Sequence, residues 1–205
     1  MEIMSSITEI MFLLSNALLY PVIIALIALV VWVLAVLGQV VSEYSGRMRD
    51  FARLRDGCQD ARIHMQKHET SEAAHVLKNA GSNPLLERYI DEIAGFIGDE
   101  RLSLESEKLL QDYELRITRE LDSLKILIRI GPMLGLMGTL IPLGPALMGL
   151  SAGNIEALAT NLVVAFSTTV LGLLVGGIAY TILLVRRRWY LQDLSDMEYV
   201  AGVLS

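Results

Sequence analysis

Two long stretches of the chain lack basic residues altogether. All seventeen lysines and arginines lie between Arg47 and Arg129 or at Arg186–Arg188. None lies in residues 1–46, and none lies in the 56 residues from Ile130 to Val185, where Glu156 is the one formal charge. A water-soluble domain spreads its charges over its surface, so this pattern argues against an ordinary soluble fold. It is typical of a chain that crosses a bilayer several times and keeps its cations on one side.

Other scarcities exclude further classes of protein. The single cysteine, Cys58, excludes an internal disulfide and a cysteine-based metal cluster. Residues 42–129 carry 14 basic and 17 acidic residues, so this segment has no basic stripe for nucleic acid. His64, His68 and His75 lie among charged residues and are better explained as solvated helix residues than as metal ligands. We therefore expect no enzymatic activity, no cofactor, no metal and no nucleic-acid partner.

Apolar residues are abundant, at 53% of the chain, and they are concentrated in blocks. The first block, Leu18–Val41, has 24 residues. As a helix it would measure about 36 Å, enough to cross a hydrocarbon core of about 30 Å. The second block, Ile130–Val185, is too long for one crossing and suits two. The run LSAGN at 150–154 predicts the turn between them, with Gly153 and Asn154 as turn residues.

These blocks predict an all-α integral membrane protein with three transmembrane helices, long cytoplasmic helical extensions and an oligomeric state. The predicted segments are an external amphipathic N-terminal segment (1–17), the first span (18–41), a cytoplasmic helical region (42–125), the second span (126–149), an external turn (150–156), the third span (157–185) and a cytoplasmic C-terminal helix (186–205). The cation bias places the N-terminus outside and the C-terminus in the cytoplasm. We expect a multi-pass protein of the plasma (inner) membrane, with its arginines near anionic lipid headgroups.

The cytoplasmic region is predicted to be helical throughout. One helix is expected over 43–79 as a continuation of the first span, and the run AGSNP at 80–84 breaks it. A second helix is expected over about 85–97. Beyond Asp99, apolar residues recur at intervals of three, four and seven, which predicts a packed helix face that runs into the second span. The members of this face are Leu102, Leu109, Tyr113, Ile117, Leu121, Leu124 and Ile128. The C-terminal tail repeats the pattern at Tyr190, Leu194, Met197, Ala201 and Leu204.

Small residues distinguish the second and third spans from the first. They allow two helix backbones to approach closely, so these two helices are expected inside an assembly. The predicted helix-packing residues are Gly131, Pro132, Gly135, Gly138, Gly172 and Gly176. Pro142 and Pro145 would free backbone carbonyls, which a membrane tolerates only where protein or water satisfies them.

Hydroxyl groups are the main polar groups of these two spans. They belong to Thr139 in the second span and to Ser167, Thr168 and Thr169 in the third. One interpretation is that each hydroxyl donates to a carbonyl about four residues earlier in its own helix. The other is that Thr139 and Thr169 line a polar path. Between Ile130 and Val185, Glu156 at the outer end is the one Asp, Glu, Lys, Arg or His, so a conducted proton would need a titrating group from a partner.

The order of these elements and two motifs resemble the MotA/TolQ/ExbB proton channel family, and in particular its shorter TolQ/ExbB-type members. Residues 131–139, GPMLGLMGT, resemble the "APLLGLLGT" opening of the family's second span. Residues 166–173, FSTTVLGL, resemble the "ATAxGL" element of its third span. The resemblance implies a homopentamer around two copies of a single-span MotB/TolR/ExbD-type partner that carries a membrane aspartate. It also implies that Thr139 and Thr169 face the pore, with Ser167 and Thr168 beside them.

By this resemblance the chain is the pore-forming subunit of an ion-motive-force-driven motor, of the stator type, with H⁺ as the expected ion. The chain departs from the family's pattern in two places, and the first of them leaves H⁺ versus Na⁺ open. Val164 stands where ExbB- and TolQ-type chains have a glutamate, and Pro142 and Pro145 interrupt a segment that relatives fill with apolar residues. The alternative is a non-conducting oligomeric membrane scaffold that docks cytoplasmic partners, which would fit every feature except the paired glycine and threonine motifs.

Overall fold

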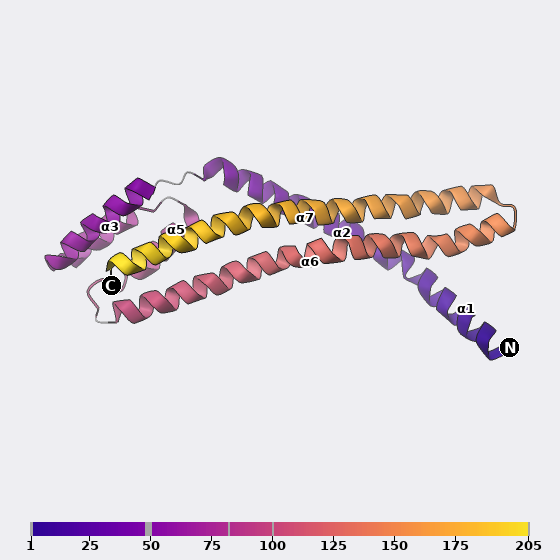
Figure 1. Ribbon diagram of the computed structural model, residues 1–205, viewed down its shortest axis with the longest axis horizontal. Helices are drawn as coiled ribbons and strands as arrows, with labels where there is room; N and C mark the ends of the chain where they lie inside the picture. Colours follow the sequence, from indigo (N-terminus) through magenta and orange to yellow (C-terminus); the bar gives the residue numbers. More distant parts are fainter. Residues whose placement is uncertain (1, 48–50, 82, 100, 205) are drawn as a thin grey trace. The chain divides into compact units, whose positions relative to one another are not determined.

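The computed structural model describes residues 2–47, 51–81, 83–99 and 101–204, and every secondary-structure element in these ranges is an α-helix (Figure 1). Among the described residues, three helical stretches are long and apolar enough to cross a membrane. These stretches are Glu9–Ser45, Leu102–Ser151 and Ile155–Leu204. The prediction of an all-α chain with three membrane-crossing helices is therefore confirmed at this level.

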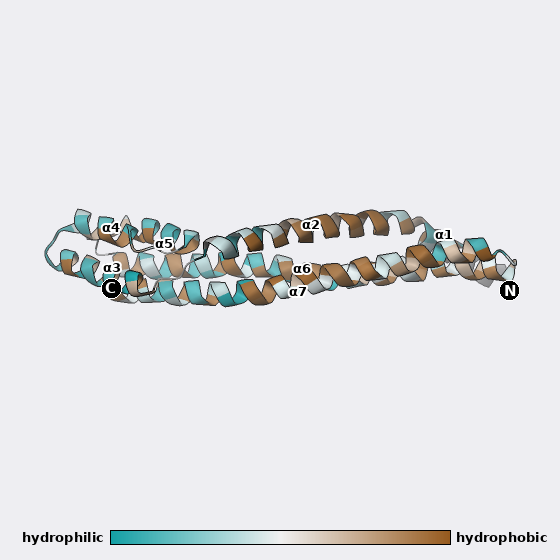
Figure 2. Cartoon of the chain, turned by 90° about the horizontal axis from the view of Figure 1, so that it is seen from above, coloured by the Kyte–Doolittle hydropathy of each residue, from teal (hydrophilic) through white to brown (hydrophobic). Residues whose placement is uncertain are grey.

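The chain divides into two compact units. Unit 1 contains Met1–Val40 and Asp122–Leu183, and unit 2 contains Val41–Leu121 and Leu184–Ser205. In Figure 2 apolar colouring covers most of helix α2 (Leu19–Gly46), whereas polar colouring prevails over the short helices of unit 2.

Unit 1 consists of α1 (Glu2–Ala17), most of α2, and the adjoining halves of α6 (Leu102–Ser151) and α7 (Ile155–Leu204). In both views α6 and α7 run side by side in opposite directions (Figures 1 and 2). Many large apolar side chains of α2 are exposed and others are only half-buried, as expected where lipid or a neighbouring chain is the surrounding medium. The buried side of α2 is a narrow stripe of Val22, Leu26, Val33 and Val40.

The turn between α6 and α7 is a Schellman motif, in which a left-handed residue ends the helix. Gly153 adopts φ 72°. Its N–H donates to the carbonyl of Leu150 at 3.1 Å, and the N–H of Asn154 donates to that of Gly149 at 2.8 Å. The side chain of Asn154 then caps α7 by accepting the Ala157 N–H at 2.9 Å. The turn coincides with the break that the LSAGN run predicts.

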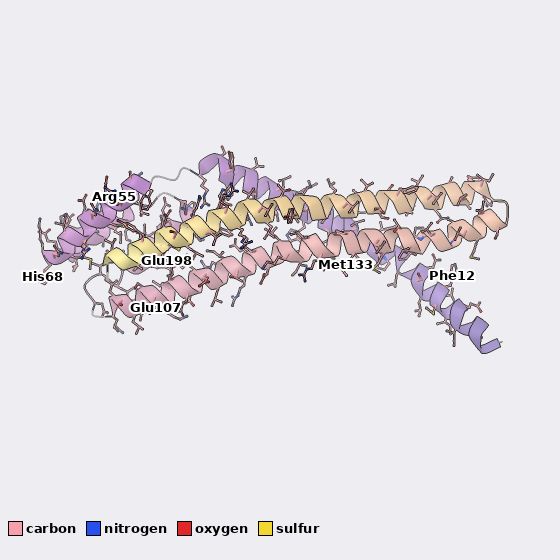
Figure 3. The ribbon with its side chains drawn as sticks, in the orientation of Figure 1. Phe12, Arg55, His68, Glu107, Met133 and Glu198 are labelled. Atoms are coloured by element: carbon pink, nitrogen blue, oxygen red, sulfur yellow. The ribbon has the colours of Figure 1, made fainter. Side chains whose placement is uncertain are left out.

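Unit 2 gathers three short helices, α3 (Phe51–Gln66), α4 (Thr70–Lys78) and α5 (Pro84–Ala94), around the N-terminal half of α6 and the C-terminal end of α7. Figure 3 labels Arg55 and His68 at the two ends of the α3 region, and Glu107 and Glu198 on α6 and α7. The core of unit 2 contains Leu54, Cys58, Ala61, Ala73, Leu77, Leu86, Tyr89, Ile90, Ile93, Tyr113, Met197, Val200 and Leu204.

The single helix predicted over 43–79 is wrong. Helix α2 ends at Gly46, and α3 and α4 are separate helices. The break between α3 and α4 is a second Schellman motif, with His68 at φ 63° and a 3.0 Å bond from the Glu69 N–H to the carbonyl of His64. A contact of 2.7 Å between His64 Nδ1 and a carboxylate oxygen of Glu69 closes the same turn. Glycine usually occupies the left-handed position, so histidine there gave no sequence signal.

Helix α5 begins slightly earlier and ends earlier than the predicted range of about 85–97. Its start follows local sequence chemistry: Asn83 is the N-cap, and its side chain accepts the N–H groups of Leu85 and Leu86 at 3.1 and 2.9 Å. Pro84 occupies the first helical turn, where its missing N–H costs little.

Two tyrosines meet in the core of unit 2. The rings of Tyr89 and Tyr113 lie edge to face, with centroids 5.6 Å apart. The hydroxyl of Tyr113 donates to Glu92 at 3.0 Å, whereas the buried hydroxyl of Tyr89 has no hydrogen-bond partner among the described residues. Burial raises the pKa of both phenols to about 12.

We predict opposite effects of removing these two hydroxyl groups. Tyr89→Phe should raise the free energy of unfolding by about 1 kcal/mol, because the Tyr89 hydroxyl loses water on burial without gaining a bond. Tyr113→Phe should lower it by about 1 kcal/mol, because it breaks the bond to Glu92. Thermal unfolding of the full chain in detergent, followed by circular dichroism, measures both. Equal destabilisation by the two changes would contradict the assignment of the Tyr89 hydroxyl as unpartnered.

Candidate ion-conducting surface on helices α6 and α7

Helices α6 and α7 touch through their backbones in unit 1. A Cβ atom built on Gly172 would lie 2.6 Å from the carbonyl oxygen of Gly131 and 2.8 Å from the Cα of Gly135. A Cβ on Gly135 would lie 3.1 Å from the carbonyl oxygen of Thr168. The first two distances are shorter than any side chain tolerates, so glycine is required where these helices meet.

The same contact continues in both directions along the helices. A Cβ on Gly138 would lie 2.6 Å from the Cβ and the hydroxyl oxygen of Thr168, and one on Gly176 would lie 2.9 Å from the ring of Pro132. We call this contact the α6–α7 seam. It comprises Gly131, Pro132, Gly135 and Gly138 on α6, and Thr168, Gly172 and Gly176 on α7.

Each of the four candidate hydroxyl groups donates its proton to a carbonyl of its own helix. The donor–acceptor distances are 2.6 Å for Thr139 to Leu136, 2.7 Å for Ser167 to Val163, 2.9 Å for Thr168 to Ala165 and 3.2 Å for Thr169 to Ala165. A hydroxyl has one proton and two lone pairs. With the proton committed to the helix, the oxygen can act toward its surroundings only as an acceptor.

The seam determines on which side of the helix pair each hydroxyl lies. Thr139 follows Gly138, and Thr169 follows Thr168, which faces Gly138 across the seam. Successive helical residues are rotated by about 100°. Because the two helices run in opposite directions, the residue after each member of a facing pair turns to the same side. Thr139 and Thr169 therefore share one side, Ser167 turns to the other, and Thr168 is only 5% exposed within the seam.

No acidic, basic or histidine side chain accompanies these hydroxyl groups in the two spans. On α7 the sequence between Glu156 and Arg186 contains none, and on α6 none follows Arg129. Val164, one of the two departures from the family's pattern noted above, is half-buried. The surface therefore offers oxygen acceptors without an acidic, basic or histidine side chain beside them.

A second polar cluster, which the sequence analysis did not predict, lies in unit 2. The guanidinium of Arg47 donates to the Asp193 carboxylate and, at 3.2 Å, to the carbonyl of Trp189. The side chain of Asn83 donates to the same Asp193 oxygen at 3.1 Å. Asp193 is 1% exposed, and burial raises its pKa above the usual value although Arg47 and Asn83 oppose the shift.

This cluster joins three separate segments of the chain. Arg47 directly follows α2, Asn83 caps α5, and Asp193 belongs to α7. The cluster thus fixes how the end of α2 and the start of α5 meet the end of α7 within unit 2. Apolar periodicity marks the packed face of α7 but gives no signal for a buried carboxylate, so sequence reasoning had no means of finding it.

We predict that the seam glycines and the neighbouring Gly177 respond differently to alanine. Gly172→Ala should lower the free energy of unfolding by about 1–3 kcal/mol, because its Cβ would overlap the α6 backbone. Gly177→Ala is the matched control on the same helix, since a Cβ there meets nothing within 4 Å. It should be neutral or stabilise the helix by up to about 1 kcal/mol. Thermal unfolding in detergent compares the two, and equal melting temperatures would argue against the seam.

We predict that Arg47→Met destabilises unit 2 in a pH-dependent way. Leaving Asp193 buried without its cation should cost about 3 kcal/mol near neutral pH. The pKa of Asp193 is already raised from 3.8, and loss of Arg47 raises it further. A raised folded-state pKa gives stability that is present at low pH and lost as pH rises. The loss should therefore shrink as the pH is lowered toward 4, in unfolding curves measured across this range.

The double change Arg47→Met/Asp193→Leu is the control for this prediction. It removes both charges, so it should cost less than Arg47→Met alone and should show no matching pH dependence. A double variant as unstable as the single one would indicate that the packing of Arg47, and not its charge, stabilises the cluster.

Comparison with known proteins identifies one family. The family model described as the MotA/TolQ/ExbB proton channel family matches residues 62–198, well over half of the chain. No curated protein and no solved structure matches it. The matched region includes both glycine and threonine motifs and the turn between α6 and α7. The chain belongs to the MotA/TolQ/ExbB proton channel family.

Proposed function

We propose that this chain is the pore-forming subunit of a motor or energy-transducing complex driven by the ion-motive force, with H⁺ as the conducted ion. Membership of the family implies an ion-driven, motor-type function in general. The observation that carries the more specific proposal is the α6–α7 seam, which supports Thr139 and Thr169 as acceptor groups on one side of the helix pair.

The proposal requires a partner that brings the charge. Neither span of the helix pair offers a titratable group at mid-membrane, so a single-span MotB/TolR/ExbD-type partner with an aspartate would supply it. A charged side chain at mid-bilayer costs on the order of 3 kcal/mol. The membrane potential supplies about 2.3 kcal/mol per charge per 100 mV. Because the two energies are comparable, ion loading and release at the partner's aspartate could drive its movement against this chain.

The hydroxyl geometry supports a specific role for each residue. Thr139 and Thr169 present lone pairs that accept hydrogen bonds from water or hydronium, and the same lone pairs can coordinate Na⁺. Thr168 has a lesser role in this proposal, because it packs in the seam. Ser167, on the other side of the helix pair, would contact a neighbouring helix of the assembly.

The proposed assembly is a homopentamer around two copies of the partner, in the plasma membrane, with the N-terminus outside. Both helices expose large apolar side chains, which supports an assembly in which other chains or lipid cover them. Among them are Met133, which Figure 3 labels, and Leu136 on α6, and Phe166 and Val170 on α7. Lipid or neighbouring chains would cover these side chains, and small-residue packing drives such association in membranes.

We predict that the hydroxyl groups of Thr139 and Thr169 are required for ion flux. Thr139→Val and Thr169→Val keep the shape of each side chain but remove the acceptor. Each should lower proton flux at least tenfold in proteoliposomes that contain the chain together with its partner. Thr181→Val is the matched control: its hydroxyl donates to the Gly177 carbonyl at 3.0 Å, outside the proposed path, and flux should stay unchanged.

Native mass spectrometry of the same samples separates a conduction defect from a failed assembly. Full flux in both valine variants would overturn the proposed pore lining. Absence of any flux from the intact assembly, in H⁺ or Na⁺ gradients, would instead support the non-conducting scaffold.

A further inference from the structure

The arginine triplet Arg186–Arg188 is divided between two environments in unit 2. Arg186 is mostly buried, and its guanidinium lies 3.8 Å from the carboxylate of Glu43. Arg187 and Arg188 are exposed, and among the described residues neither has a hydrogen bond, an ion pair or a ring contact. One arginine therefore contributes to the fold, whereas the other two are free to bind a group outside the chain.

The two exposed arginines line a shallow groove on α7. Its volume is about 480 Å³. Two leucines in the groove, Leu184 and Leu191, are 50% and 59% exposed. The lining residues are Leu184, Arg187, Arg188, Leu191, Gln192 and Ser195. The spacing of three and four residues places them on one face of the helix.

The groove combines chemistry that few ligands match. Two guanidinium groups favour a phosphate, which they can bind through paired N–H donors. Exposed leucines beside them favour an apolar group, which a soluble anion or an acidic peptide would leave uncovered. In sequence the groove begins within two residues of Val185, the predicted end of the third span. An anionic phospholipid carries its phosphate at that level and its apolar part directly beside it.

We propose that the α7 groove binds an anionic phospholipid, with Arg187 and Arg188 on its phosphate and Leu184 and Leu191 against its apolar part. Gln192 and Ser195 provide donors and acceptors for a polar headgroup beyond the phosphate. The binding site does not depend on ion conduction, since it uses none of the residues of the proposed ion path.

Lipid retention by the purified full chain tests this site. The chain in neutral detergent is titrated with phosphatidylglycerol or with phosphatidylcholine of the same acyl chains, and native mass spectrometry counts the bound lipids. Arg187→Gln/Arg188→Gln should weaken phosphatidylglycerol binding about 30-fold, equal to about 2 kcal/mol for two basic residues near the membrane. Phosphatidylcholine binding should weaken much less, because its choline group offsets the charge of its phosphate.

Three matched samples test whether binding depends on the α7 groove itself, on positive charge, or on the phosphate alone. Arg55→Gln/Arg62→Gln removes two exposed arginines of α3 and should retain the preference for phosphatidylglycerol. Arg187→Lys/Arg188→Lys keeps both positive charges and should retain most of the preference for phosphatidylglycerol. Glycerol phosphate at millimolar concentration should not displace the lipid. An unchanged preference in the glutamine pair, equal loss in the α3 control, or displacement by glycerol phosphate would each overturn the proposal.

The same spectra report the oligomeric state. If Arg187→Gln/Arg188→Gln changes the number of associated chains but leaves the lipid preference intact, the groove is a contact between copies and the proposal is wrong. Circular dichroism verifies that each variant remains helical. Should the glutamine pair fail to fold, Leu184→Ser/Leu191→Ser takes its place and is expected to weaken lipid binding while retaining both charges.

Discussion

Unit 1 depends on the direct contact between the backbones of α6 and α7. A bilayer gives two apolar helices little reason to associate, because lipid tails are as apolar as leucine, so close packing must hold them together. Gly131, Gly135 and Gly172 make that packing possible by leaving no side chain between the helices. The contact fixes the register, and the register places Thr139 and Thr169 on one side. The proposed ion path therefore rests on a constraint made by residues that carry no functional group.

The two Schellman turns show how much of the fold the sequence could predict. The turn at Gly153 was predictable, because glycine readily adopts a left-handed backbone and Asn154 is a common helix cap. The turn at His68 has the same hydrogen-bond pattern, but a histidine occupies the left-handed position. A side-chain contact between His64 and Glu69 closes this turn. Residue propensity gives no signal for a histidine in a left-handed turn, so one long helix was expected there.

The sequence predicted the residues of the candidate site but not how they are arranged. Spacing of small residues identified the packing positions, and hydroxyl groups in apolar spans identified the candidate threonines. The sides on which these threonines lie required the register, which sequence periodicity does not give. The Arg47–Asp193 cluster had no signal at all, because its members come from segments 146 residues apart. Likewise the sequence presents Arg186 to Arg188 as one basic run, and only packing against Glu43 distinguishes the first from the other two.

The direction of the hydroxyl hydrogen bonds has a consequence for selectivity by charge. Thr139 and Thr169 each give their proton to the preceding turn of their own helix, so both oxygens point the negative ends of their dipoles outward. A surface of this kind attracts cations and offers an anion no donor. Discrimination between the two signs of charge would then reside in the orientation of two neutral groups, since no Asp, Glu, Lys or Arg lies in residues 130–151 or 157–185.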